Sequence, residues 1–273
     1  GKAKKEKINK VLVDRSHFDS KKKKKKNIMS GTVLVNNMVV DKAGFMIDND
    51  AEIRIKNDAI QYVSRGGLKL EKAVENWGIR LDDKVCMDIG SSTGGFTDCM
   101  LQNGAKKVYS VDVGYGQLDW KLRNDERVKV MERTNIRNVK PDDLEDRIQF
   151  FSIDVSFISL RLVLPKLTEL GDSSFECIAL VKPQFEVGRE EVGKNGVVRD
   201  PAKHLKAVRK CADYAIEAGL YLTGIDYSPI KGPKGNIEFL MLLSSNREKN
   251  IEDLENALED VVNNAHINLD KQS

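Results

Sequence analysis

The chain has 273 residues, of which 40% are hydrophobic and 32% charged, and its net charge is +3. This composition is typical of a globular protein with one or two domains and a large buried core. No run of about 18 apolar residues occurs, so we expect no membrane-spanning helix. No apolar stretch follows the lysine-rich start, so we also expect no secretory signal.

The four cysteines and three histidines show no pattern of metal ligands. None of the cysteines belongs to a CxxC pair, and all stand in apolar or helical surroundings: Cys86, Cys99, Cys177 and Cys211. Free buried thiols in a reducing cytoplasm are therefore expected rather than disulfides. The histidines are far apart in sequence and predict no metal site: His17, His204 and His266.

Positive charge is concentrated in residues 1–58, which hold 15 Lys and Arg against 8 Asp and Glu. Residues 8–18 have helical spacing, and "GTVLVNN" and "AEIRIK" predict short strands. The six lysines 21–26 favour either a helix with one charged face or a disordered run. Because this part carries +7 and the rest of the chain −4, we expect a small α+β module that binds a polyanion.

Strands and helices alternate between residues 59 and 245, beginning with a helix in "GGLKLEKAVENW". The expected strands are 85–89, 107–112, 127–131, 148–153, 176–181, 220–227 and 236–243. The expected helices between them are 95–103, 118–124, 141–146, 159–169 and 201–218. This alternation predicts a Rossmann-like, doubly wound and mostly parallel sheet. Residues 246–273 hold 3 basic and 7 acidic residues, and we expect a solvated C-terminal helix or tail there.

The stretch "VCMDIGSSTGGFTDCM", residues 85–100, predicts a strand, a glycine-rich loop and a helix. Ligands of such sheets bind at the carboxyl ends of the strands. The loop contains neither GxGxxG nor GxxxxGK[ST], which are the spacings typical of phosphate binding. A small ligand without a pyrophosphate is therefore favoured.

An acid, Asp112, ends the next strand, 24 residues after Asp88. An acid in this place accepts hydrogen bonds from ribose hydroxyls, and glycines let the backbone approach a ligand closely. The pattern favours S-adenosylmethionine, which contains a ribose, an adenine and an amino acid. A dinucleotide of the NAD type and a glycine turn that binds nothing remain alternatives at this point.

Four ionisable residues lie at or near strand ends: Lys69, Asp154, Lys182 and Glu238. Singly, each has an ordinary explanation, such as a lysine reaching out of the sheet or an outward-facing acid. Together, two lysines and two acids can neutralise one another around one pocket, and burial beside a second cation favours the neutral form of a lysine. A neutral lysine can take the proton of a ribose 2′-hydroxyl, whose oxygen then attacks the methyl group in line.

These four residues match the Lys-Asp-Lys-Glu tetrad of FtsJ-like RNA 2′-O-methyltransferases. More closely, the chain resembles the TlyA family, often labelled hemolysin A, over about residues 8–243. The stretches that carry the resemblance are "YVSRGGLKLEKA", "DIGSSTGGFTDCMLQNGAKKVYSVDVGYGQLDWKLRND", "IDVSFISLRLVLP", "LVKPQFEVGREEVGKNGVVRDP" and "SPIKGPKGNIEFL".

The resemblance implies S-adenosylmethionine-dependent 2′-O-methylation of cytidines in ribosomal RNA, with ribosomal RNA or ribosomal subunits as partners. It implies an RNA-binding module similar to ribosomal protein S-four in residues 1–58 and an FtsJ-like domain in residues 59–245. The expected catalytic residues are the tetrad. The expected cofactor-binding residues are Asp88, Gly90, Ser91, Ser92, Thr93, Gly94, Gly95, Phe96, Thr97, Asp112, Val113, Asn135 and Ile136.

Further residues are candidates for contact with RNA because of their positions in loops. The cations are Arg65, Arg133, Arg137, Arg189, Lys194 and Arg199, and ordinary solvated charges are the alternative. Phe157 and Phe185 are candidates to stack on a flipped-out base, with core packing as the alternative.

Two other functions are alternatives to the enzyme. A membrane-lytic protein, as the hemolysin label suggests, needs a spanning segment or a strongly amphipathic surface helix, and neither is evident. A catalytically silent RNA-binding protein has no need of an intact tetrad.

Overall fold

The computed structural model describes residues 4–14, 33–36, 38–42, 44–55 and 61–270. The lysine run 21–26 lies outside these residues. The chain divides into two compact units, one ending at Arg65 and the other beginning at Gly66. Each unit is described by itself.

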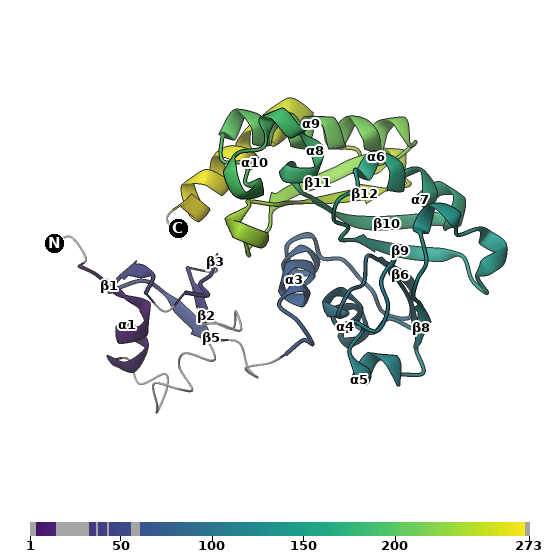
Figure 1. Ribbon diagram of the computed structural model, residues 1–273, viewed down its shortest axis with the longest axis horizontal. Helices are drawn as coiled ribbons and strands as arrows, with labels where there is room; N and C mark the ends of the chain where they lie inside the picture. The colour runs from purple at the N-terminus through teal and green to yellow at the C-terminus, as the bar shows by residue number, and fades with distance from the viewer. Residues whose placement is uncertain (1–3, 15–32, 37, 43, 56–60, 271–273) are drawn as a thin grey trace. The chain divides into compact units, whose positions relative to one another are not determined.

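The first unit contains one described helix and two small sheets (Figure 1). Strands β1 (Lys5–Lys7) and β4 (Met46–Asp48) pair antiparallel, and α1 (Ile8–Asp14) follows β1 directly. Strands β3 (Met38–Val39), β2 (Val33–Val35) and β5 (Ile53–Ile55) form the second sheet, with Asn36 in the left-handed conformation at the turn between β2 and β3. A common core joins helix and strands: Ile8, Val11, Leu12, Val33, Val35, Val40, Ile47 and Ala51.

The second unit is built on a seven-stranded sheet in the order β11-β12-β10-β9-β6-β7-β8. The strands are β6 (Val85–Ile89), β7 (Lys107–Val111), β8 (Val128–Met131), β9 (Ile148–Ile153), β10 (Gly171–Val181), β11 (Tyr221–Tyr227) and β12 (Phe239–Ser244). Strands β6 to β10 pair parallel with one another, and β12 runs antiparallel between β10 and β11. The expected doubly wound, mostly parallel sheet is confirmed.

Helices cover both faces of this sheet (Figure 1). On one side lie α3 (Gly66–Trp77), α4 (Gly95–Gln102) and the short α5 (Trp120–Arg123); on the other lie α6 (Leu160–Val163), α8 (Pro183–Glu186), α9 (Pro201–Glu217) and α10 (Leu254–Leu269). The remaining helix, α7 (Pro165–Leu170), leads into β10. The central strands are apolar throughout because both faces are covered, and all five residues of β6 are buried.

Several elements differ from their expected bounds. The helix expected at 141–146 is a single 3₁₀ turn, Pro141–Asp143, and the one expected at 159–169 is divided where Pro165, which has no N–H, begins α7. Strand β10 begins at Gly171 rather than near 176. Strand β12 begins at Phe239, so Glu238 precedes the strand instead of lying inside it.

The C-terminal helix is packed rather than solvated, which corrects the expectation for residues 246–273. One face of α10 is buried against β11 and α9, through Leu258, Val261, Val262, Ala265 and Leu269. These positions recur at intervals of three and four residues, which is the spacing of a core-facing helix. The acidic residues within the helix, Glu255, Glu259 and Asp260, are exposed, and the net charge of the segment concealed the apolar stripe.

Among the described residues, no helix is long and apolar enough to cross a membrane. The four cysteines are buried free thiols, as expected. Burial raises the pKa of the Cys86 thiol to about 12, so this thiol stays protonated and unreactive.

Replacing the fully buried Leu258 by alanine tests the packing of α10. We expect Leu258→Ala to lower the free energy of unfolding by about 2–5 kcal/mol, because the cavity it leaves is only partly filled by its neighbours. The matched change Ile267→Ala, at a side chain that is 59% exposed on the same helix, should alter it by less than about 0.5 kcal/mol. Urea denaturation provides both values, and equal effects would show that α10 is not docked.

Candidate active site

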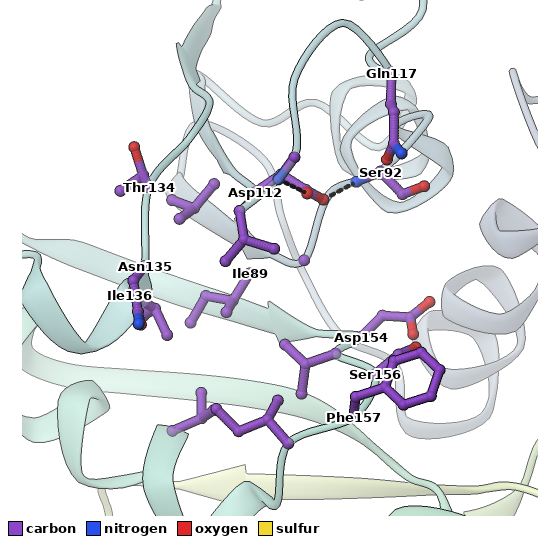
Figure 2. A pocket seen from close by; sticks show the side chains of 17 residues that line it. Ile89, Ser92, Asp112, Gln117, Thr134, Asn135, Ile136, Asp154, Ser156 and Phe157 are labelled. Atoms are coloured by element: carbon purple, nitrogen blue, oxygen red, sulfur yellow. Dashed lines mark hydrogen bonds between the residues drawn. The ribbon is translucent and has the colours of Figure 1, made fainter.

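A cavity of about 430 Å³ opens at the carboxyl ends of the central strands. Figure 2 shows three groups of polar residues around it: Ser92, Asp112 and Gln117, then Thr134 and Asn135, then Asp154 and Ser156. Between them the wall is apolar, with Ile89, Val111, Val113, Ile136, Val155, Ile158 and Val163. This is the edge of a doubly wound sheet at which ligands bind.

Two glycines give the loop after β6 its shape. Gly90 has φ +84°, and a Cβ there would overlap the backbone carbonyl of Asp154. Gly94 has φ +104° at the start of α4, and a Cβ there would overlap the Leu122 side chain. Both positions need a left-handed conformation and a close approach, so only glycine fits. The loop thereby lies against the end of β9, and Asp154 is the residue that follows this strand.

Asp112 joins the glycine loop to the loop after β7. Its Oδ2 accepts from the Ser92 backbone N–H at 2.6 Å, and its Oδ1 accepts from the Gly114 N–H at 2.7 Å (Figure 2). A carboxylate oxygen has two acceptor sites, so each oxygen can still accept a ligand hydroxyl. The carboxylate is therefore fixed in place and faces the cavity with spare acceptors.

Asp88 and Thr97 lie behind the cavity wall rather than in it. Asp88 is fully buried, and its carboxyl accepts from Thr97 Oγ1 at 2.7 Å and from Ser152 Oγ at 3.2 Å. Burial raises its pKa to about 7, and the nearby Asp154 adds to the rise. These bonds tie the first turn of α4 to β9, so Asp88 holds the loop from behind.

The expected cofactor residues thus fall into two groups. Those that line the cavity are Gly90, Ser92, Asp112, Val113, Asn135 and Ile136. Ser91 lines a small adjoining hollow, and the others shape the loop and α4 without lining the cavity: Asp88, Thr93, Gly94, Gly95, Phe96 and Thr97. Sequence reasoning missed Gly114, Gln117, Thr134, Ile158 and Val163. Most of these follow the same strand ends, which is the signal that could have found them.

The cavity suits S-adenosylmethionine better than a dinucleotide. No lysine or arginine is among the residues that line it, while two acids, Asp112 and Asp154, are. A pyrophosphate would meet these carboxylates without a cationic partner, whereas a sulfonium cation is favoured beside them. The apolar wall next to Asn135 is suited to a flat adenine ring.

The four tetrad residues form two ion pairs. Lys182 Nζ lies 2.5 Å from Asp154 Oδ1 and 3.2 Å from Ser156 Oγ. Lys69 Nζ donates to Glu238 Oε1 at 3.1 Å, and Gln184 Nε2 donates to Glu238 Oε2 at 3.2 Å. The side chain of Glu238 is fully buried and that of Lys182 is 9% exposed, so neither has the outward-facing position that the ordinary explanation requires.

Sheet topology brings these residues together from distant parts of the sequence. Asp154 follows β9, and Lys182 follows the neighbouring strand β10. Because β12 runs antiparallel to β10 and Phe239 pairs with Val181, the residue before β12 comes beside the residue after β10. Glu238 therefore lies at the same edge as Lys182, and α3 supplies Lys69.

The RNA-facing candidates lie on exposed loops, apart from one that is engaged within the first unit. Arg65 forms an ion pair with Asp41. Arg133 is placed over the ring of Tyr115, 4.4 Å from its centroid. The four other candidate cations are exposed and do not line the cavity: Arg137, Arg189, Lys194 and Arg199.

Phe157 is 89% exposed at the mouth of the cavity and has φ +63°, an uncommon conformation for a non-glycine residue. Its ring lies 4.8 Å from that of Phe185, measured between centroids. Core packing does not explain so exposed a ring.

A glycine loop after the first strand, a fixed acid after the second and a cavity suited to a sulfonium define an S-adenosylmethionine-dependent methyltransferase. The chain belongs to the FtsJ-like methyltransferase family, which it matches over residues 62–245. The cofactor of such enzymes is S-adenosylmethionine, and the expected family is confirmed.

Relatives extend the similarity beyond the methyltransferase unit. The chain is 52% identical over 242 residues to a candidate rRNA methyltransferase, YqxC, of Bacillus subtilis, covering 88% of this chain and 86% of that protein. It is 38% identical over 264 residues to the 16S/23S rRNA (cytidine-2′-O)-methyltransferase TlyA of Mycobacterium tuberculosis, covering 96% and 98%. A solved structure of a candidate hemolysin from Streptococcus thermophilus is 44% identical, with a TM-score of 0.75 and 98% of each chain covered.

Gly90→Ala should disrupt the cofactor site. A Cβ at residue 90 overlaps the Asp154 carbonyl, so the loop must move away from β9, and we expect the Kd for S-adenosylmethionine to rise on the order of tenfold or more. Gly219→Ala is the matched control, since Gly219 has φ +79° and open space around it. It should cost about 1–2 kcal/mol of stability and leave the Kd unchanged. Isothermal titration calorimetry measures the Kd of both variants. An unchanged Kd for Gly90→Ala would contradict the assignment of the cofactor site to this loop.

Asp88 should make stability depend on pH. Its pKa of about 7 in the folded protein exceeds that of an unfolded aspartate, so between about pH 4 and 7 the folded chain holds a proton that the unfolded chain lacks. This contribution to stability is therefore lost as the pH rises to 7, by at most about 1.4 kcal/mol per pH unit. Asp88→Asn has no carboxyl group at residue 88 and lacks this pH dependence. The melting temperature of this variant relative to the unsubstituted protein should therefore increase from pH 5 to pH 8. A constant difference would contradict the raised pKa.

Proposed function

We propose that this protein transfers a methyl group from S-adenosylmethionine to the 2′-hydroxyl of cytidine riboses in ribosomal RNA. One observation carries the proposal: Asp154 both lines the cofactor cavity and forms an ion pair with Lys182. A group that can handle a proton therefore lies directly at the donor site. The similarity to the Mycobacterium tuberculosis enzyme over nearly the whole chain supports the substrate class.

The cavity residues hold and orient the cofactor in this proposal. Asp112 accepts hydrogen bonds from the ribose hydroxyls, while Asn135 and Ile136 contact the adenine. The glycine loop allows the backbone at Gly90 to approach the amino-acid part. When bound, S-adenosylmethionine supplies an electrophilic methyl group on a positively charged sulfur.

Lys182 is the group proposed to take the proton of the target hydroxyl. An ammonium has no lone pair, so the base must be the neutral amine, and Asp154 at 2.5 Å is placed to accept or hold its proton. Ser156, 3.2 Å from the same nitrogen, fixes its direction. Because Lys182 and Asp154 are held by the ends of adjacent strands, most of the acceleration should come from positioning.

Glu238 and Lys69 form the second half of the site. A fully buried carboxylate is stable only if it is paired and hydrogen-bonded, and Lys69 with Gln184 provides both. We propose that this pair binds the target ribose or its phosphate through Lys69, whose side chain is 13% exposed. Glu238 keeps that ammonium in place.

RNA recognition is proposed to involve both units. The first unit carries the excess of positive charge and would bind the phosphate backbone as an S-four-like module. On the second unit, Arg133, Arg137, Arg189, Lys194 and Arg199 are proposed phosphate contacts, and exposed Phe157 with Phe185 a stacking surface for a flipped-out base. Four buried free thiols are compatible with the cytoplasm, where we place the reaction.

Lys182→Ala tests the catalytic role. We expect a loss of at least about 10²-fold in kcat for methyl transfer to ribosomal RNA, because the proton acceptor is removed. The Kd for S-adenosylmethionine should change little, since Lys182 does not line the cavity. Lys166→Ala is the matched control: Lys166 is similarly buried at 9% exposure and paired with Glu169, but lies on α7.

Tritiated methyl transfer followed by mapping of 2′-O-methyl sites measures these variants. Near-normal methylation by Lys182→Ala would contradict the proposed mechanism. A methylated base in place of a methylated ribose would contradict the proposed reaction.

A further inference from the structure

Two histidines that are 62 residues apart in sequence meet between α9 and α10. His204 Nδ1 lies 2.8 Å from His266 Nε2, and the two rings are 4.9 Å apart between centroids. His204 Nε2 lies 2.8 Å from the Val198 carbonyl oxygen, and His266 Nδ1 lies 2.8 Å from Asp270 Oδ2. All four ring nitrogens are thus within hydrogen-bond distance of a partner.

Counting protons shows that this arrangement holds one proton more than two neutral histidines. A carbonyl and a carboxylate only accept, so His204 Nε2 and His266 Nδ1 must both carry hydrogen. Two neutral rings would then direct lone pairs at each other across the remaining 2.8 Å contact. One additional proton makes that contact a hydrogen bond, and a second would place two N–H groups face to face. The geometry therefore requires three protons on four nitrogens.

The charge of the extra proton is balanced from α10. Asp270 is its carboxylate partner, and Asp200, at the N-terminal cap of α9, is the other acid that acts on His204. The ring of Phe239 from β12 packs on His204 at 5.9 Å and is uncharged. Burial lowers the pKa of His204, which disfavours a positive charge on that ring alone.

Hydrogen bonds lead from His204 toward the tetrad. The Val198 carbonyl accepts from His204, and the Val198 N–H donates to Asn236 Oδ1 at 2.9 Å. Asn236 is buried, and its Nδ2 donates to the carbonyls of Gly196 and Pro233 at 2.9 and 3.2 Å. Its side chain thereby ties the loop after α8 to the loop before β12.

The second of these loops supports Glu238 directly. The Gly232 N–H donates to the Asn236 carbonyl at 2.7 Å and closes the loop. A Cβ at Gly232 would overlap the Glu238 carboxylate, so this turn lies in contact with that group. An unbroken series of contacts therefore runs from Asp270 through both histidines, Val198 and Asn236 to Glu238.

We propose that His204 and His266 share one proton and that this proton-holding pair is a positioning device for Glu238. The inference rests on the proposed function only in assigning Glu238 to the reaction. While the proton is present, α10 is bonded to α9 and the Val198 carbonyl is held in place. When it is lost at higher pH, the facing lone pairs repel, and His204 moves with Val198 and the Asn236 loop.

Nuclear magnetic resonance of the full chain labelled with ¹⁵N tests the pair without any measurement of activity. Between pH 5 and 9, the ring nitrogens of His204 and His266 should change together at one midpoint. The Val198 backbone amide and the Asn236 side-chain amide should shift at the same midpoint. Independent titration of the two rings, or no response of Val198 and Asn236, would overturn the proposal.

Two substitutions at residue 266 separate the proton from the packing. In His266→Gln the amide Nε2 can donate to His204 Nδ1 without titrating, so kcat should stay near normal and its pH profile should lose the midpoint of the pair. His266→Ala breaks the series, and kcat should fall on the order of tenfold. The KM for S-adenosylmethionine should not change, because none of these residues lines the cofactor cavity. Ile267→Ala, on the exposed side of α10, is the control.

The outcomes distinguish this proposal from the proposed function. If His266→Ala only destabilises the fold, kcat per folded molecule is unchanged at 25 °C and the positioning role is wrong. If His266→Gln keeps the pH midpoint, the shared proton is wrong. If Lys182→Ala keeps its activity while the resonances of the pair behave as expected, the proposed mechanism fails and the shared proton stands.

Discussion

The close approach of Gly90 to the Asp154 carbonyl is the constraint on which the active site depends. The Asp154 N–H donates to the Ile89 carbonyl at 2.9 Å, and the absence of a side chain at residue 90 lets the glycine loop lie against the end of β9. The cofactor cavity and the first tetrad acid are consequently parts of one wall. A larger residue at 90 would separate the glycine loop from Asp154 and its ion pair with Lys182.

Several buried charges among the described residues have a partner of opposite charge. Glu238 is paired with Lys69, Lys182 with Asp154, and the proton shared by His204 and His266 faces Asp270. Two buried acids, Asp88 and Glu186, instead accept hydrogen bonds from hydroxyl or backbone N–H groups, and burial raises the pKa of both. Charges taken out of water are costly unless they are paired. An ion pair thus joins the ends of β9 and β10, and in our proposal a single proton decides the contact between α9 and α10.

Much of the fold could be predicted from local pattern alone. Apolar runs gave the strands, helical spacing gave α3 and α9, and the order of elements gave the doubly wound sheet. The absence of the two glycine spacings that are typical of phosphate binding favoured a small ligand without a pyrophosphate. Two predictions were wrong because local signals conflict: Pro165 divides a helix whose apolar spacing continues across it, and the seven acidic residues of 246–273 hid the apolar stripe that docks α10.

The sequence by itself favoured S-adenosylmethionine as the ligand and selected the four ionisable residues as candidates, because residue types at strand ends restrict the chemistry. It did not determine which of the four are partners. Lys182 pairs with Asp154 because β9 and β10, which these residues follow, lie side by side. Glu238 pairs with Lys69 because α3 brings that lysine to the edge where β12 begins. It also did not reveal the contact of His204 with His266. Sequence separation says nothing about two helices packed on one face of a sheet, and only tertiary structure brings their side chains within 2.8 Å.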